Sequence, residues 1–240
     1  MVAETSPLAA TPQPLSAQPK KRRKALRILS AIAVLVVAWG ALDLYGPRQS
    51  SLRDFDPDEV ARLETDMWRA YYDKQRVRLF TQLAELMRSQ YHFPYLRSNA
   101  VAYQAAKAAF VFKEGHSRSD YEKALPNLIS YYISIKKVSG ADFDVNRAAQ
   151  LELEWWIVHR NRASVPAGSL DRALAELPAE IYQMPPGQFM EHARYRAEAM
   201  TIRDDKADQG GVSEEDWARI DTLLHQSWRS LWEVVRIQPA

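Results

Sequence analysis

The stretch LELEWWIVHR, from Leu151 to Arg160, has the residue types of a chemical site. It holds the carboxylates Glu152 and Glu154, two adjacent tryptophans and a histidine. A carboxyl group flanked by indoles is shielded from water, and this raises its pKa because the charged form is disfavoured. The stretch therefore raises the hypothesis of a general acid or base at Glu152.

Helix geometry argues against a metal site in the same stretch. Glu152 and His159 lie on one stripe of a helix, and Glu154 points to the far face. Seven residues separate Glu152 from His159 by roughly 10.5 Å along the helix axis, which is too far for both to bind one ion. The chain also has no Glu-x-x-His or His-x-x-x-His pair and no phosphate-binding loop. We therefore expect no metal ion and no cofactor.

A structural role for Glu152 is favoured over catalysis, because the chain offers no nucleophile motif beside it. In this interpretation the carboxylate is buried, the indoles belong to the core, and a basic residue of a neighbouring helix compensates the charge. Arg194 or Arg196 is the predicted partner. We assign no catalytic residue and predict a buried polar or interaction site made of Glu152, Trp155, Trp156, His159, Arg194 and Arg196.

A second aromatic group, Trp68, Tyr71 and Tyr72, has the spacing of one helix face. Such a stripe could stack against a ligand, but it is more typical of core packing. Leu63 and Met67 continue the same side of the helix, so we predict packing.

The elements that carry these residues are predicted to be all-α, because apolar residues recur at three and four positions from residue 56 onward. Asp56 has the features of an N-cap, with Pro57 at the first helical position and Glu59 placed to complete a capping box. The helix that begins there is expected to end before Pro94. Further helices are predicted over 97–113, from 119, over 142–161, from 169, over 187–208 and after Ser213.

The segment from Ala105 to Tyr132 resembles a degenerate tetratricopeptide unit in its order of small and bulky residues, which are Ala108, Ala109, Phe110, Phe112, Gly115, Tyr121, Ala124 and Leu128. Small residues also recur 46 and 45 residues apart, at Ala102, Ala148 and Ala193. The resemblance implies a solenoid-like stack of helical hairpins that serves as a binding surface and has no intrinsic chemistry. A compact helical bundle is the alternative architecture.

The amino-terminal region predicts a membrane anchor. Six basic residues lie before a stretch without charge from Ile28 to Leu42. About 20 apolar residues cross a bilayer, so we predict a disordered basic-ended tail over 1–24, a transmembrane helix over 25–46 and a soluble all-α domain over 47–240. The basic cluster favours a cytoplasmic amino terminus and an extracytoplasmic domain in the cell membrane. A signal peptide cleaved near Ala41 is the alternative.

The charge balance of the chain excludes one class of partner. The net charge is +2, but without the six basic and two acidic residues before Arg48 the body has 26 basic and 28 acidic residues. A body near −2 lacks the basic face that nucleic acids require. The chain has no cysteine, which excludes disulfides and thiolate metal sites.

These observations predict a single-pass membrane-anchored helical domain that acts as a protein-interaction module. Its expected partners are the lipid bilayer, through the amino-terminal helix, and other proteins, with a homo-oligomer left open and no nucleic acid. The alternatives are an enzyme that uses a buried carboxylate at Glu152 and a structural or oligomerising membrane protein. A deep pocket that contains Glu152 and a second ionisable group would favour the enzyme, and an open apolar groove would favour the interaction module.

Overall fold

The protein is all-α in a computed structural model that describes residues 19–237, and no strand occurs within that range. The fold class predicted from the sequence is therefore confirmed. The chain forms two compact units, residues 1–42 and residues 43–240. The division lies a few residues before the predicted start of the soluble domain at residue 47.

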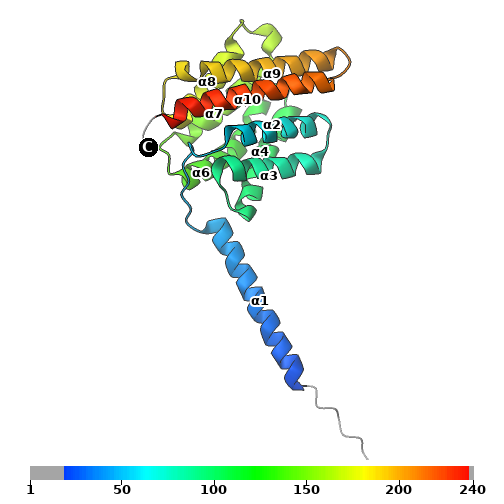
Figure 1. Cartoon of the computed structure of the whole chain (residues 1–240), viewed down its shortest axis with the longest axis vertical. Helices are drawn as coiled ribbons and strands as arrows, with labels where there is room; N and C mark the ends of the chain where they lie inside the picture. Colours follow the sequence, from blue (N-terminus) through cyan, green and yellow to red (C-terminus); the bar gives the residue numbers. More distant parts are fainter. Residues whose placement is uncertain (1–18, 238–240) are drawn as a thin grey trace, which may run out of the picture. The chain divides into compact units, whose positions relative to one another are not determined.

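The first helix, α1, runs from Pro19 to Tyr45 (Figure 1). It therefore includes the basic residues 20–24, and the prediction that they belong to a disordered tail is wrong. Lys and Arg are good helix formers, which explains why the helix continues through them. The rest of the predicted tail, residues 1–18, lies outside the described residues. The part from Lys24 to Tyr45 is long and apolar enough to cross a membrane.

The body begins with the last turn of α1, where Asp43 caps another helix. Its carboxylate Oδ1 accepts hydrogen bonds from the backbone N–H groups of Leu96 (2.9 Å) and Arg97 (3.1 Å), at the start of α4. The N-cap position of α4 is Pro94, which has no side-chain acceptor, so Asp43 supplies it from a distant part of the chain. Arg97 in return donates to the carbonyl oxygens of Asp43 and Gly46.

Helix α2, Pro57–Tyr72, starts as predicted at Asp56, whose side chain accepts from the N–H groups of the second and third helical residues. In this described segment Glu59 does not complete the predicted capping box, because its carboxylate pairs with Arg62. The prediction of one helix as far as Pro94 is wrong.

The chain breaks after Tyr72 and reverses into α3, Arg76–Tyr91. Lys74 adopts a left-handed conformation with φ of 58° at this turn. No local signal predicts this turn, because neither glycine nor proline occurs between the two helices. Figure 1 shows the two helices as an antiparallel pair.

The remaining helices of the body follow in chain order. They are α4 Tyr95–Glu114, the short α5 Arg118–Glu122, α6 Leu125–Ser139, α7 Val145–Arg160, α8 Ser169–Tyr182, α9 Met190–Asp208 and α10 Glu214–Arg236, with 3₁₀ turns at Arg162–Ser164 (η1) and Pro186–Phe189 (η2). Ser213 starts α10 as predicted, and it forms a complete capping box with Asp216.

The eight long helices of the body form a closed ring. Each of α2, α3, α4, α6, α7, α8, α9 and α10 contacts the next one in this order, and α10 packs against α2. A solenoid would leave its first and last helices apart, so the arrangement is a closed bundle. The small residues Ala102, Ala148 and Ala193 are completely buried, which lets neighbouring helices approach closely.

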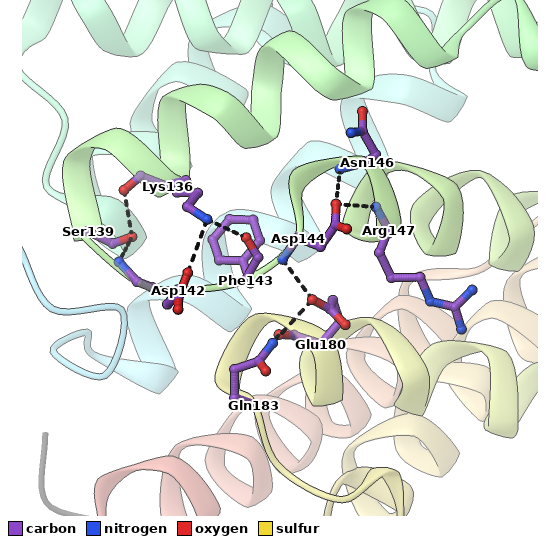
Figure 2. A network of polar contacts seen from close by, with 10 residues as sticks. Lys136, Ser139, Asp142, Phe143, Asp144, Asn146, Arg147, Glu180 and Gln183 are labelled. Carbon is purple, nitrogen blue, oxygen red and sulfur yellow. Dashed lines mark hydrogen bonds and ion pairs between the residues drawn. The ribbon is translucent and has the colours of Figure 1, made fainter.

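Side-chain contacts fix the start of α7 relative to its neighbours (Figure 2). Asp144 caps α7 through the N–H groups of Asn146 and Arg147, and its own N–H donates to Glu180 of α8 at 2.8 Å. Lys136 of α6 donates to the carbonyl oxygen of Phe143 at 2.7 Å. These contacts set the register of the helix that carries the LELEWWIVHR stretch.

Candidate functional site: a cavity inside the helical ring

The ring encloses a cavity of about 640 Å³ to which all eight long helices of the body contribute. This volume lies within the ~300–1,000 Å³ range of small-molecule sites. The walls are largely aliphatic and aromatic, with Met67, Leu83, Met87, Leu128, Leu174 and Met200 among the aliphatic contributors. Three carboxylates, Glu64, Glu152 and Asp204, line the cavity within the described part of the chain.

The two ends of the cavity differ. At one end the segment before α2 covers the helical ring, and its side chains Leu52 and Phe55 are buried there. The hydroxyl of Tyr182 donates to the carbonyl oxygen of Leu52 at 3.0 Å. At the other end lie the exposed lining residues Arg160 and Phe110, near the carboxyl ends of α7 and α4. This second end is the entrance, and its lining residues form the rim.

Glu64 is the most deeply buried carboxylate of the cavity, with 2% of its surface exposed. It forms an ion pair with Arg196 of α9, which includes a 2.8 Å hydrogen bond from Nη1 to Oε2. The indole Nε1 of Trp228 also donates to Oε2, at 2.6 Å. The Arg196 guanidinium lies about 6 Å from the ring centres of Trp68, Trp155 and Trp228. Charge and hydrogen bonds are therefore satisfied within the protein.

Glu152 lines the same cavity but has neutral partners. Its Oε2 accepts from the Tyr132 hydroxyl at 2.7 Å, and its Oε1 accepts from Nε1 of Trp156 at 2.9 Å. Burial raises the pKa of Glu152, and the hydrogen bonds from Tyr132 and the indoles and the charge of Arg196 only partly oppose this shift. No cation of the described chain lies within ion-pair distance of Glu152.

Asp204 pairs with three basic side chains near the rim. Its carboxylate lies 3.0 Å from Nε2 of His159, 2.9 Å from Arg162 and 2.8 Å from Arg203. Burial alone would raise the pKa of Asp204, but the hydrogen bonds and charges of these partners outweigh it and lower the pKa. The Arg203 guanidinium also lies over the ring of Tyr72, whose pKa is raised to about 12 by burial.

Arg160 is the remaining rim cation and is used to close a helix end. It donates to the carbonyl oxygens of Phe112 (3.0 Å) and Gly115 (2.9 Å) at the end of α4. Its guanidinium stacks 4.2 Å from the centre of the Phe112 ring. A cation at a helix carboxyl terminus is also favoured by the helix dipole.

His192 lies at the inner end and is neutral at physiological pH. Burial, together with the nearby charge of Arg196, lowers the pKa of His192 to about 3. Its Nδ1 lies 3.0 Å from the Ser227 carbonyl oxygen and 2.8 Å from the Ser227 hydroxyl. The imidazole of His192 is thus held by Ser227 of α10, and we assign it a structural role.

Five of the six residues predicted as a polar site come together at the cavity: Glu152, Trp155, Trp156, His159 and Arg196. The predicted ion pair of Glu152 is not formed. Arg194 is exposed on the other side of α9, and Arg196 pairs with Glu64 instead. The stripe Trp68, Tyr71 and Tyr72, predicted as packing, lines the cavity as well.

Glu64 and Asp204 were not predicted as part of this site. Glu64 is 132 residues from Arg196, and only the closure of the ring by α10 and α2 brings them together. An available signal was the position of Glu64 on the apolar side of α2, between Ala61 and Trp68, where an unpaired charge would be costly.

The arrangement can hold a largely apolar molecule and hydrogen-bond to it at Glu152. Among the described residues no group of three or more histidine, aspartate or glutamate side chains has the geometry of a metal site. Comparisons with protein-family models, with curated proteins and with solved structures give no match for this chain.

Proposed function

We propose that the body of this protein binds a small, mostly apolar molecule inside the helical ring, and that α1 holds it at a membrane. The observation that carries the proposal is the cavity of about 640 Å³ with eight helices in its wall. A well-packed bundle of this size would fill such a space with side chains, because cavities cost stability. A retained cavity with a few placed polar groups is typical of ligand sites.

The test of this proposal is to fill the cavity. Ala105 of α4 lines it, so Ala105→Trp should occupy much of the space. The full-length protein, purified in lipid nanodiscs, is extracted with organic solvent, and the extract is compared by mass spectrometry. We expect a small molecule that co-purifies with wild type to be lost from this variant.

The control for that experiment is Ala100→Trp, which adds the same side chain to an exposed position of the same helix. It should retain the co-purified molecule. Identical extracts from the wild type and both variants, with nothing above the empty-nanodisc background, would contradict ligand binding in the cavity.

For the anchor we propose a single membrane crossing in the cell membrane, with the amino terminus in the cytoplasm and the ring outside. The basic residues before Ile28 support this orientation. A reporter that is active only outside the cytoplasm should give signal when fused to the carboxyl terminus, and the fusion should sediment with membranes. A soluble product that begins near Ala41 would instead support a cleaved signal peptide.

An enzyme that uses Glu152 is the second candidate function. A deep pocket that contains Glu152 and further ionisable groups is the feature expected of such an enzyme. The raised pKa of Glu152 suits a general acid. We rank it second because the chain offers no nucleophile motif beside Glu152, and the partner with which Glu152 would share a proton is a tyrosine of strongly raised pKa. Interaction with other proteins stays a prediction.

A further inference from the structure

We infer that Glu152 is the recognition group for an ammonium group on the bound molecule, so that the ligand is an organic cation with an apolar body. This inference rests on the proposed function and specifies the class of ligand. It starts from a difference among the three cavity carboxylates. Glu64 and Asp204 each have cationic partners within the described chain, whereas the partners of Glu152 are neutral donors.

The neutral donors leave room for a ligand. A carboxylate has about four acceptor positions, and the Tyr132 hydroxyl and the Trp156 indole each take one. The carboxylate lines the cavity, so its remaining positions can be reached from inside. An ammonium group has three donors and the charge that this site lacks.

The net charge of Glu64, Arg196 and Glu152 also favours a cationic ligand. Glu64 and Arg196 cancel each other, so ionised Glu152 leaves the inner polar cluster at −1. Burying this uncompensated charge is costly unless a ligand supplies the opposite one. Aromatic rings of Tyr131, Trp155 and Trp156 line the cavity around it, and aromatic faces attract cations.

The rim does not provide an equivalent site for an anion. Arg162 and Arg203 are both paired with Asp204, and Arg160 donates to the carbonyl oxygens at the end of α4. The rim still carries more positive than negative charge, so it should slow the entry of a cation. Glu152 and Arg160 are eight residues apart, about 12 Å along α7, so this repulsion is weaker at the binding position than at the entrance.

The pH dependence follows from the groups that face Glu152. These groups are Tyr91 of α3, Tyr131 and Tyr132 of α6, Arg196 of α9 and, beyond Arg196, Glu64 of α2. Burial raises the pKa of each of the three tyrosines, so they stay neutral near pH 7. Burial also raises the pKa of Glu152, so its protonated fraction grows as the pH falls from neutral. An alkylammonium, with a pKa of about 10, stays charged as the pH falls.

The experiment compares 4-phenylbutylammonium, 4-phenylbutanol and 4-phenylbutyrate, which share one apolar body. Calorimetry uses the full-length protein in nanodiscs, with empty nanodiscs as the reference. At pH 7.5 we expect the ammonium to bind at least about tenfold more tightly than the alcohol, the effect of one charge-assisted hydrogen bond. Lowering the pH to 5.5 should reduce this preference, and ammonium binding there should release protons.

Glu152→Gln should reduce the ammonium-to-alcohol preference to about one and abolish proton release, while the alcohol still binds. Glu154→Gln is the matched control, because Glu154 lies two residues away and pairs with Arg118 outside the cavity. It should behave as the wild type. If Glu152→Gln does not fold, the wild-type pH profile and Tyr132→Phe, which keeps the carboxylate and should keep the preference, decide the question.

Equal binding of the alcohol and the ammonium to the wild type, or tighter binding of 4-phenylbutyrate, would overturn the assignment of Glu152 but leave ligand binding in the cavity intact. Binding that Ala105→Trp does not reduce, for all three compounds, would overturn the proposed function itself. The two failures are therefore distinguishable.

Discussion

Glu64 and Glu152 lie in the wall of one cavity, and each accepts a hydrogen bond from a tryptophan indole. They differ in the second partner, which is the guanidinium of Arg196 for Glu64 and the hydroxyl of Tyr132 for Glu152. A buried carboxylate with a guanidinium has its charge balanced inside the fold. The partly buried carboxylate of Glu152, whose partner is a hydroxyl, has no such balance, and desolvation raises its pKa. The same residue type therefore has a cationic partner at one position and only neutral donors at the other.

The largest effect on stability is expected from breaking the ion pair between Glu64 and Arg196. Arg196→Met should destabilise the body by about 3–5 kcal/mol, because it leaves Glu64 buried without a cation. Adding Glu64→Leu to this variant should recover much of the loss, since both charges are then removed. Denaturant unfolding of the full-length protein measures both.

Arg194→Met is the control for Arg196, because Arg194 lies two residues away on the exposed side of α9. It should change the unfolding free energy by no more than about 0.5 kcal/mol. A similar loss for both arginine variants would show that the Glu64 pair has no special role.

A second prediction uses pH to separate the unpaired carboxylate from a paired one. The folded pKa of Glu152 is raised, so its contribution to stability is complete below the pKa of an unfolded glutamate and is lost as pH rises through the folded pKa. Glu152→Gln removes this loss. The unfolding free energy of the variant should therefore improve relative to wild type as pH increases from 5 to 8.

Asp204→Asn should show the opposite slope. The folded pKa of Asp204 is lowered, so its contribution is present above the pKa of an unfolded aspartate and is lost as pH falls. This variant should be less stable than wild type at pH 7, and the difference should shrink below about pH 4. Parallel pH profiles for the two variants would contradict the contrast between the two sites.

Local signals in the sequence predicted much of the fold but little of the charge pairing. Asp56 and Ser213 start helices as predicted, because a cap depends on residues within one turn. The turn at Lys74 was missed, since tertiary packing of α2 against α3 holds a lysine in a conformation that favours glycine.

The charge pairing in the cavity wall could not be predicted from local signals either, because it also depends on tertiary packing. The stripe of Glu152 and His159 is visible in the sequence and does face the cavity. Which arginine neutralises which glutamate depends on the closure of α10 against α2, and the hairpin pattern is equally compatible with an open stack. The prediction that Arg194 or Arg196 pairs with Glu152 was therefore wrong, because Arg196 pairs with Glu64.

The smallest effect is expected from removing the Tyr132 hydroxyl that donates to Glu152. Tyr132→Phe removes the donor to Oε2 of Glu152 and leaves the ring in place. A single hydrogen bond contributes about 0.5–1.5 kcal/mol, so the loss of stability should stay in that range. The loss should be larger at pH 8 than at pH 5, because the hydroxyl stabilises the ionised carboxylate and matters less when Glu152 is protonated. In the double variant with Glu152→Gln the extra loss at pH 8 should disappear. If Tyr132→Phe has the same effect at both pH values, the Tyr132 hydroxyl does not support the charge of Glu152, and the contrast with the Arg196 pair would have to come from burial alone.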